Sequence, residues 1–382
     1  MRTSICLIGD LPPPFSGPEI AMQKLLRSRL REQYRIHHFS FGMNRANIDR
    51  GRVTPGKIIH FMYKLLRLHI LLNRFHPDCV YYYFAQTRLG LIKDLLVTWV
   101  IRLRRRKIIL HLRGGNFRRF YDLQPPIIRK FIRMNLKRGN KILVQSECLS
   151  EMFDGIISRD RIGILYNGLE PDEMTNGSES AETKDELIVF FLGQLSYAKG
   201  YFDLLLALPK IVSQVTNVRI LLAGERIPLS AERNIHLHYI SAMETRFEAV
   251  ERARSIERDY SEYIQYLGVV DAATRAEVMA RTDVFVLPTY SEGFSNAVLE
   301  AMGHGLPVIT TPVGAHPDIF RETPDVLVPP GDPETLGRSI VRMLKDRPLR
   351  KEIGRYNRQQ VNRQYNMDCV VAQFVQTIES VV

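Results

Sequence analysis

The sequence has few of the features that disulfide-stabilised, secreted or membrane-spanning proteins need. Its 382 residues include four cysteines, which are scattered and form no CxxC spacing: Cys6, Cys79, Cys148 and Cys369. No apolar run reaches the about 20 residues that cross a bilayer. The N-terminal MRTSICLIGDLPPP also lacks the apolar region of a signal peptide. We therefore expect reduced thiols and a cytoplasmic protein.

Acidic residues are scarce in the first part of the chain. Residues 1–150 hold 29 Lys and Arg against 8 Asp and Glu, whereas residues 151–382 hold 24 Lys and Arg against 33 Asp and Glu. Net charges of opposite sign indicate two domains with different partners, the first of them facing something anionic. The sequence contains no recognised nucleic-acid-binding motif, so we do not expect nucleic acid to be that partner.

Two stretches concentrate the positive charge. Arg102–Lys107 reads RLRRRK, and Ile127–Lys141 interleaves apolar with basic residues. A basic amphipathic helix suits an anionic membrane surface. A helix whose apolar stripe is core and whose charges are solvated gives the same pattern. Because the excess of positive charge extends over all of residues 1–150, we expect peripheral association with the inner face of the cytoplasmic membrane.

Apolar runs of strand length alternate with helical patterns, which is typical of parallel sheets covered by helices on both faces. The first half has expected strands at Ser4–Ile8, Ile36–Phe41, Cys79–Phe84, Lys107–Leu112, Lys141–Val144 and Ile162–Leu165, with helices between them, for example Ile20–Arg31, Lys57–Asn73 and Ile127–Arg138. The second half has expected strands at Leu187–Leu192, Val218–Ala223, Ile264–Leu267, Val284–Leu287, Pro307–Thr310 and Val326–Val328, and helices at Gly200–Val215, Ala272–Ala280, Ser295–Gly303 and Pro333–Lys345. We predict an α/β protein with two doubly wound parallel-sheet domains facing a cleft.

A polar segment separates the two series. Pro171–Glu186, PDEMTNGSESAETKDE, has almost no apolar residue and is interpreted as a linker. We place one domain at 1–170, a second at 187–364, and at 365–382 a C-terminal helix that packs back on the first domain. Residues 225–262 show no strand pattern, but apolar residues between Phe247 and Tyr260 recur at helical spacing. This predicts a helix there, and packing on its own domain is favoured over contact with a partner.

The densest functional signal lies in the second half. After the buried strand Val284–Leu287, the loop Thr289–Phe294 leads into a helix that starts near Ser295, a good N-cap residue. Backbone N–H groups and the helix dipole form an anion site at such a position, and Gly293 lets the backbone approach a ligand.

Two carboxylates bracket this helix start, Glu292 in the loop and Glu300 in the second helical turn. Carboxylates accept hydrogen bonds from vicinal hydroxyls, so each suits a sugar or a ribose. An isolated pair of glutamates at this spacing would more often be solvated. Here the strand, loop and helix around the pair favour a binding site.

The element, with seven residues between its glutamates, resembles a signature of the retaining GT-B glycosyltransferases of the glycosyltransferase family 4 type (glycosyl transferases group 1). The resemblance covers nearly the whole chain. Further similar segments are PPPFSGPE at Pro12–Glu19, ILYNGLE at Ile164–Glu170, FLGQLSYAKGYFDLLLAL at Phe191–Leu208, LLAGE at Leu221–Glu225 and IQYLGVV at Ile264–Val270. The resemblance implies two Rossmann-like domains, the first binding the acceptor and the second binding a nucleotide sugar.

The resemblance also implies roles for single residues. Glu300 is expected to bind the nucleotide ribose, Glu292 the hydroxyls of the donated sugar, and Lys199 the diphosphate. The other expected donor-binding residues are Gly17, Gln194, Gly293, Phe294, Ser295, Asn296 and Ala297. No D-x-D motif occurs, so we expect no obligatory metal and no cofactor beyond the UDP- or GDP-type donor itself.

Three positions depart from the family pattern. Gln194 stands where the family usually has an Arg, so a neutral amide replaces a charge. At the end of the fourth strand the family has a catalytic His directly before a Gly. Here either His111 is that residue or Arg113, which precedes Gly114, occupies its place. An Arg at this point could supply the charge that Gln194 lacks, whereas His111 could equally be a buried structural residue. Gly17-Pro18 replaces the two adjacent glycines that the family often has.

The expected function is transfer of a sugar from a nucleoside-diphosphate sugar to a hydroxyl of a polysaccharide or lipid-linked glycan, with retention, in bacterial surface polysaccharide or lipopolysaccharide synthesis. One alternative is a catalytically silent GT-B scaffold or membrane-surface binding protein, which Gln194 and Arg113 would favour. A second is a sugar-nucleotide epimerase on the same fold.

Overall fold

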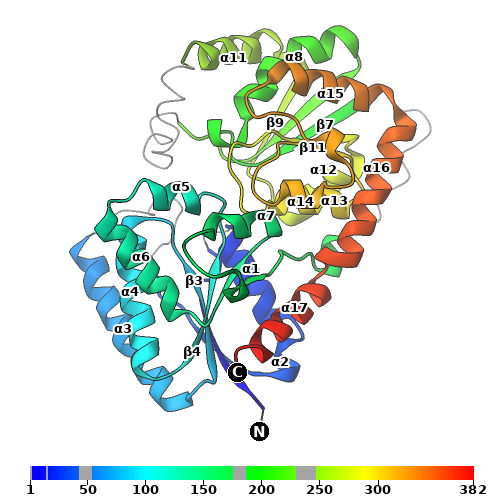
Figure 1. The fold of residues 1–382 in the computed structure, drawn as a ribbon. Helices are drawn as coiled ribbons and strands as arrows, with labels where there is room; N and C mark the ends of the chain where they lie inside the picture. The colour runs from blue at the N-terminus through cyan, green and yellow to red at the C-terminus, as the bar shows by residue number, and fades with distance from the viewer. Residues whose placement is uncertain (1, 14–15, 43–53, 175–185, 229–246) are drawn as a thin grey trace. The chain divides into compact units, whose positions relative to one another are not determined.

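The chain forms two compact units, each with its own parallel sheet. The structure is a computed structural model that describes residues 2–13, 16–42, 54–174, 186–228 and 247–382 (Figure 1). The first unit comprises Met1–Gly168 and Met367–Val382, and the second comprises Leu169–Asn366. Their sheets have six and five strands, so the predicted α/β fold with two parallel sheets is confirmed.

The first unit has the strand order β2-β1-β3-β4-β5-β6. Its strands are β1 Ser4–Ile8, β2 Arg35–Phe39, β3 Cys79–Phe84, β4 Lys107–Leu112, β5 Lys141–Val144 and β6 Ile162–Ile164. Its helices are α1 Gly17–Arg27, α2 Leu30–Gln33, α3 Pro55–Phe75, α4 Arg88–Leu103, α5 Phe117–Asp122, α6 Pro126–Arg138, α7 Glu147–Ser150 and the returning α17 Met367–Glu379.

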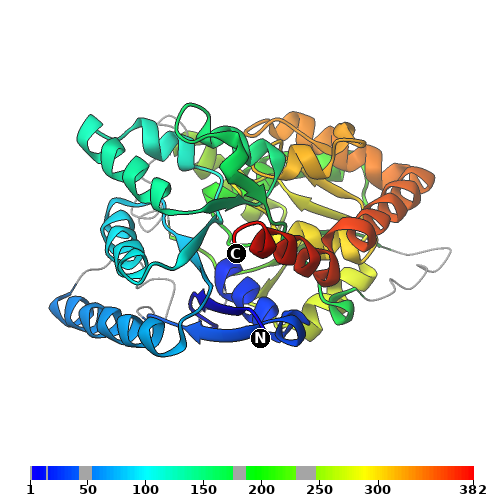
Figure 2. The same ribbon diagram turned by 60° about the horizontal axis from the view of Figure 1, so that its bottom comes forward.

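Alternate strand residues of the first sheet enter two separate cores. Cys6, Val80 and Leu110 pack with side chains of α3, α4 and α6. Leu7 and Tyr81, one residue along their strands, pack with side chains of α1 and α17. Because successive side chains of a strand point to opposite faces, this sheet is covered on both sides. The end of the chain therefore completes the core of the first unit (Figure 2).

The second unit has the strand order β11-β10-β7-β8-β9. Its strands are β7 Leu187–Leu192, β8 Val218–Ala223, β9 Ile264–Gly268, β10 Val284–Leu287 and β11 Val308–Thr310. Its helices are α8 Tyr201–Gln214, α11 Phe247–Asp259, α12 Ala272–Arg281, α13 Asn296–Gly303, α14 His316–Ile319, α15 Pro333–Lys345 and α16 Arg347–Gln360.

The helix expected between Phe247 and Tyr260 is confirmed as α11, which packs on α8 of the same unit. Residues 175–185 of the predicted linker and residues 229–246 of the 225–262 segment lie outside the described residues. Within the described part of the chain, no helix combines the length and apolar character that a membrane span requires.

Two predicted elements were wrong. Val326–Val328 is not a strand, because the proline-led turn Pro324–Val326 occupies its start and a single bridge joins Leu327 to Thr310. The helix expected at Ile20–Arg31 is divided into α1 and α2, because Ser28 takes an extended backbone conformation with ψ of 171°. The other predicted elements coincide with observed ones apart from small differences at their ends, while α4, α5, α7, α14 and α16 were not among the helices given above.

Candidate functional site

Two loops of the second unit meet where the strand order reverses. β7 has β8 on one side and β10 on the other, and ligands bind such sheets at the carboxyl ends of the strands at this reversal. The loop after β7 carries Lys199 and the loop after β10 carries Glu292. The Tyr290 N–H donates to the Ala198 carbonyl at 2.9 Å, which joins the two loops.

Gly200 makes this approach possible. It has a φ of +72°, and a Cβ atom there would lie 1.9 Å from the Pro288 carbonyl oxygen. A side chain is therefore excluded both by the left-handed backbone and by the neighbouring loop. The Lys-Gly sequence fixes where Lys199 stands relative to Glu292.

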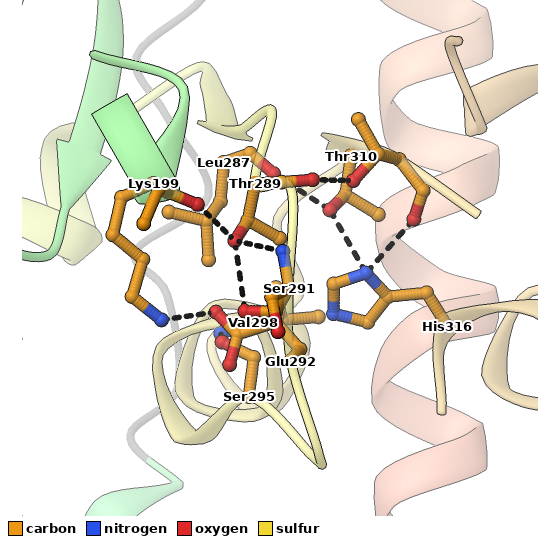
Figure 3. A network of polar contacts seen from close by, with 11 residues as sticks. Lys199, Leu287, Thr289, Ser291, Glu292, Ser295, Val298, Thr310 and His316 are labelled. Carbon is orange, nitrogen blue, oxygen red and sulfur yellow. Dashed lines mark hydrogen bonds and ion pairs between the residues drawn. The ribbon is translucent and has the colours of Figure 1, made fainter. Parts of the chain in front are cut away.

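Lys199 and Glu292 form an ion pair in this structure (Figure 3). Lys199 Nζ lies 2.5 Å from Glu292 Oε1, with the lysine side chain 27% and the glutamate side chain 10% exposed. The residue expected to bind the diphosphate thus contacts the residue expected to bind the sugar. Both retain access to solvent, so an anionic ligand can compete for the lysine.

The helix start between the glutamates has the predicted cap. Ser295 is the N-cap of α13, and its hydroxyl accepts a hydrogen bond from the Val298 N–H at 3.4 Å. The first turn of a helix offers N–H groups beyond the helical ladder and the positive end of the dipole. Asn296 and Ala297 occupy that turn, and Phe294 beside it is buried against Tyr365, with ring centroids 5.5 Å apart.

The loop after β11 supports the same helix start. Ala315 N–H donates to the Gly293 carbonyl at 2.9 Å. Gly314 has a φ of +61°, and a Cβ atom there would lie 2.4 Å from the Glu292 carbonyl oxygen. The loop after β11 therefore holds the backbone of Glu292 and Gly293, while the loop after β7 contacts Glu292 through the Lys199 side chain.

Glu300 is paired with an arginine that the sequence did not single out. Arg275 Nε, from α12, donates to Glu300 Oε2 at 3.0 Å, and the glutamate side chain is 17% exposed. The two glutamates at the ends of the signature thus each have a cationic partner from another element. Because Arg275 lies 25 positions before Glu300, no local pattern joins them.

His316 is a second residue to which the sequence analysis assigned no role. It is fully buried, and its Nδ1 lies 2.9 Å from the Thr311 carbonyl oxygen. Since a carbonyl only accepts, Nδ1 carries the proton and Nε2 is left as an acceptor. Burial lowers the pKa of His316, although the Glu292 carboxylate opposes this shift. Among the described residues Nε2 has no hydrogen-bond partner.

Gln194 follows β7 and Gly193 and is partly exposed. The nearby Arg226 does not replace the arginine expected at position 194, because it donates to Glu257 of α11 at 2.6 Å. Its guanidinium also lies over the Tyr266 ring at 5.4 Å. Arg226 therefore does not supply the positive charge that position 194 lacks.

The remaining predicted residues, Gly17, His111 and Arg113, belong to the first unit. Gly17 is the first residue of α1, with Pro18 next to it as expected for a helix start. His111 lies in β4 and is fully buried, with Nδ1 2.5 Å from the Tyr81 hydroxyl. Burial, then the Arg113 charge, lowers the pKa of His111 well below its ordinary value.

Arg113 extends from the end of β4 to the residues after β5 and β6. Its Nη2 donates to Asn167 Oδ1 at 2.5 Å, and Gln145 Nε2 donates to the same oxygen at 2.8 Å. The guanidinium also lies 5.3 Å from the Tyr83 ring centroid. His111 and Arg113 both lie against the Tyr83 ring, His111 fully buried and Arg113 partly exposed.

A cavity of about 620 Å³ lies elsewhere in the second unit, lined among others by Thr323, Arg342 and Tyr356. None of its lining residues belongs to the predicted site. In the described ranges, no group of three or more His, Cys, Asp or Glu side chains is placed to hold a metal ion.

Comparison with solved structures identifies proteins with the same fold over the full length of this chain. Sucrose-phosphate synthase from Thermosynechococcus elongatus superposes with a TM-score of 0.73 at 18% identity, covering 99% of each chain. Anabaena HepE, solved in complex with UDP-glucose, superposes with a TM-score of 0.66 at 16% identity, covering 100% of each chain. The two-domain architecture of these proteins, GT-B, is thus the fold of this chain.

Sequence comparison finds relatives and a family model. The capsular polysaccharide biosynthesis glycosyltransferase CapM of Staphylococcus aureus is 26% identical over 251 residues, 63% of this chain and 56% of the relative. This chain spans 56 to 59% of the length of CapM and two other curated relatives that it matches. Residues 173–360, which contain Lys199, Arg275, Glu292 and Glu300, match the model of glycosyl transferases group 1, so this segment belongs to that family.

Proposed function

We propose that the protein transfers a sugar from a nucleoside-diphosphate sugar to a hydroxyl of a polysaccharide or lipid-linked glycan, with retention and without a metal ion. The observation that supports this is the arrangement around α13. Two carboxylates, each with a cationic partner, flank a capped helix start where the strand order reverses. The family match covers this same segment.

In this proposal each part of the donor has a partner. The ribose hydroxyls donate to Glu300, which Arg275 holds in place. The diphosphate lies at the first turn of α13, near Phe294, Ser295 and Asn296, where N–H groups and the dipole favour an anion. Lys199 turns from Glu292 towards the diphosphate, and Glu292 is released to accept from hydroxyls of the sugar.

The same groups account for the chemistry. When the bond between the anomeric carbon and the phosphate oxygen breaks, negative charge develops on the departing nucleoside diphosphate. Lys199 and the α13 dipole stabilise that charge, which is the part a metal ion plays in other phosphate sites. The acceptor oxygen then forms the new bond to the anomeric carbon, and its proton passes to the released phosphate oxygen of the departing nucleoside diphosphate.

A UDP-type donor is supported by HepE, which was solved with UDP-glucose. The capsule relative CapM supports a role in bacterial surface polysaccharide synthesis. We further propose that the protein works in the cytoplasm, at the membrane surface, on a lipid-linked or polysaccharide acceptor. The positive charge of residues 1–150 supports the membrane part.

Turnover of a panel of UDP- and GDP-sugars tests the proposal, with nucleoside diphosphate release as the signal. We expect slow hydrolysis with one donor class, unchanged by chelator and strongly reduced in Glu292→Gln. Glu322→Gln, an exposed glutamate of the same unit, serves as the matched control. Nucleotide binding without any turnover would instead support the silent scaffold, and interconversion of the sugar would support an epimerase.

A further inference from the structure

Three neighbouring helices of the first unit have apolar side chains on both of their sides. α3, α4 and α6 pack in that order, α3 on α4 and α4 on α6 (Figure 1). Their inner sides pack in the core against the sheet, through residues such as Leu68, Val97 and Ile132. A globular helix of this kind normally has a polar outer side.

The outer side of α3 is apolar along most of its length. Ile59, Leu66 and Ile70 are 71%, 58% and 51% exposed, and they recur at spacings of seven and four residues. Residues at such spacings lie on one side of a helix. The exposed side chains therefore form a continuous stripe, opposite to the buried stripe that contains Leu65 and Leu68.

α4 and α6 continue this surface. Ile92, Trp99 and Leu103 of α4 are each more than half exposed, at spacings of seven and four residues. On α6, Ile127 and Phe131 are exposed one turn apart. Exposed apolar patches of this extent mark interaction sites. We call these outer side chains of α3, α4 and α6 the apolar face.

The charges around the apolar face are almost all positive. α3 contains four Lys and Arg residues, α4 three and α6 five, whereas the acidic residues of all three helices amount to Asp94. Asp94 is buried and accepts a hydrogen bond from the Tyr82 hydroxyl at 2.5 Å, so it does not contribute to the surface. The three helices thus present apolar and cationic side chains without an exposed carboxylate.

We propose that the apolar face docks in the plane of an anionic lipid bilayer, with α3 and α4 lying in the headgroup region. Apolar side chains enter the boundary with the acyl chains, and the basic residues contact lipid phosphates. Trp99 lies in this face, and indole rings favour that boundary. A second copy of the chain fits less well, because two such faces would bring like charges together. The inference specifies the membrane partner of the proposed function, but no step of it depends on sugar transfer.

Vesicle binding of the full chain tests the inference, with Trp99 as probe because it is the single Trp. We expect co-sedimentation with vesicles of phosphatidylcholine and phosphatidylglycerol and a shift of Trp99 emission to shorter wavelength. Binding to phosphatidylcholine alone should be at least tenfold weaker, and added salt should weaken binding to the mixed vesicles. Equal binding to both vesicle types, or no binding, would overturn the proposal.

Variants identify the surface. Ile59→Gln with Leu66→Gln and Ile70→Gln should lower anionic vesicle binding at least tenfold, and Arg67→Glu with Arg74→Glu should do the same. The matched controls are Val269→Gln, at a position 78% exposed, and Lys351→Glu, both in the second unit. All variants should keep the circular dichroism and UDP affinity of the wild type. A failure of the membrane proposal is therefore distinguishable from a failure of the proposed donor site. Unchanged vesicle binding in the α3 variants would contradict the proposal. If the wild type instead self-associates without lipid and these variants abolish that association, the partner of the apolar face is a second copy of the chain.

Discussion

At the scale of single residues, the hydrogen bond between the Tyr81 hydroxyl and His111 Nδ1 determines which nitrogen of His111 carries the proton. The Tyr81 hydroxyl is fully buried, and burial raises its pKa well above the ordinary value, so it keeps its proton. If it donates to His111 Nδ1, the imidazole proton resides on Nε2, which has no partner among the described residues. Tyr81 would then act as a positioning residue that presents an Nε2–H donor at the end of β4.

Removing that hydroxyl should change the tautomer of His111. In Tyr81→Phe, we expect nitrogen-15 spectra to show His111 moving from the Nε2–H form to a mixture of tautomers, with the fold retained. The signal is assigned by its loss in His111→Gln. The account is contradicted if wild-type His111 already holds its proton on Nδ1, or if Tyr81→Phe leaves the tautomer unchanged.

His111 should also make the stability of the first unit dependent on pH. Burial lowers its pKa in the folded state well below 6.5, so the unfolded chain binds a proton at a higher pH than the folded chain does. The contribution of neutral His111 to the unfolding free energy is therefore complete above pH 6.5, where the unfolded chain is also neutral. Below that pH the contribution is lost, by about 1.4 kcal/mol per pH unit. In urea unfolding followed at Trp99, we expect His111→Gln to show a smaller loss between neutral and acidic pH than wild type. Parallel curves for the two proteins would refute this.

At the scale of elements, Gly200 and Gly268 form a matched pair. Both have left-handed backbones, with φ of +72° and +70°, but only at Gly200 would a Cβ atom meet another loop. Gly268→Ala should cost about 1–2 kcal/mol of unfolding free energy, the penalty of that backbone for a residue with a side chain. Gly200→Ala should cost clearly more and weaken nucleotide binding, because the loop with Lys199 must move. Equal costs in denaturant titrations would show that the close approach does not matter.

Much of the element pattern could be predicted from the sequence. Continuous apolar strands such as Cys79–Phe84 and Val284–Leu287 match buried parallel strands because both faces of each sheet are covered. α4 was missed because its apolar residues lie on two sides and leave no single stripe. Val326–Val328 has the composition of a strand but lacks a neighbouring ladder beyond one bridge.

The candidate site was predictable only in part. Glu292, Ser295 and Glu300 lie within nine residues, so their relation to one helix start follows from local structure. Arg275 and His316 reach the site from α12 and from the start of α14, and only the order of strands in the sheet brings them there. Pairings of this kind depend on tertiary structure and leave no mark in sequence spacing.

At the scale of the whole molecule, the chain leaves the first unit at Gly168 and returns to it at Met367. Leu169 N–H donates to the Tyr365 carbonyl at 2.8 Å, so the outgoing and returning segments run side by side. The returning α17 contributes Val370, Phe374 and Ile378 to the core of the first unit. That core therefore depends on residues of α17 as well as on those before Gly168.

Phe374→Ala should show this dependence. Phe374 is fully buried, and its ring centroid lies 4.7 Å from that of Tyr81. Truncation of such a side chain costs about 3–5 kcal/mol. We expect unfolding followed at Trp99, which reports the first unit, to shift to lower urea, while nucleotide binding by the second unit persists. Loss of nucleotide binding at the same lowered urea concentration as the Trp99 transition would contradict this division.

The central claim is that Glu292 to Glu300 form a donor site. Calorimetric titration of UDP and GDP into wild type, Glu300→Gln and the control Glu322→Gln tests it most directly. The account predicts that wild type and Glu322→Gln bind one nucleotide with equal affinity and that Glu300→Gln binds it about tenfold or more weakly, since a hydrogen bond to a charged group contributes about 1.5–3 kcal/mol. Equal affinity in Glu300→Gln, or no binding of either nucleotide by wild type, would contradict the account.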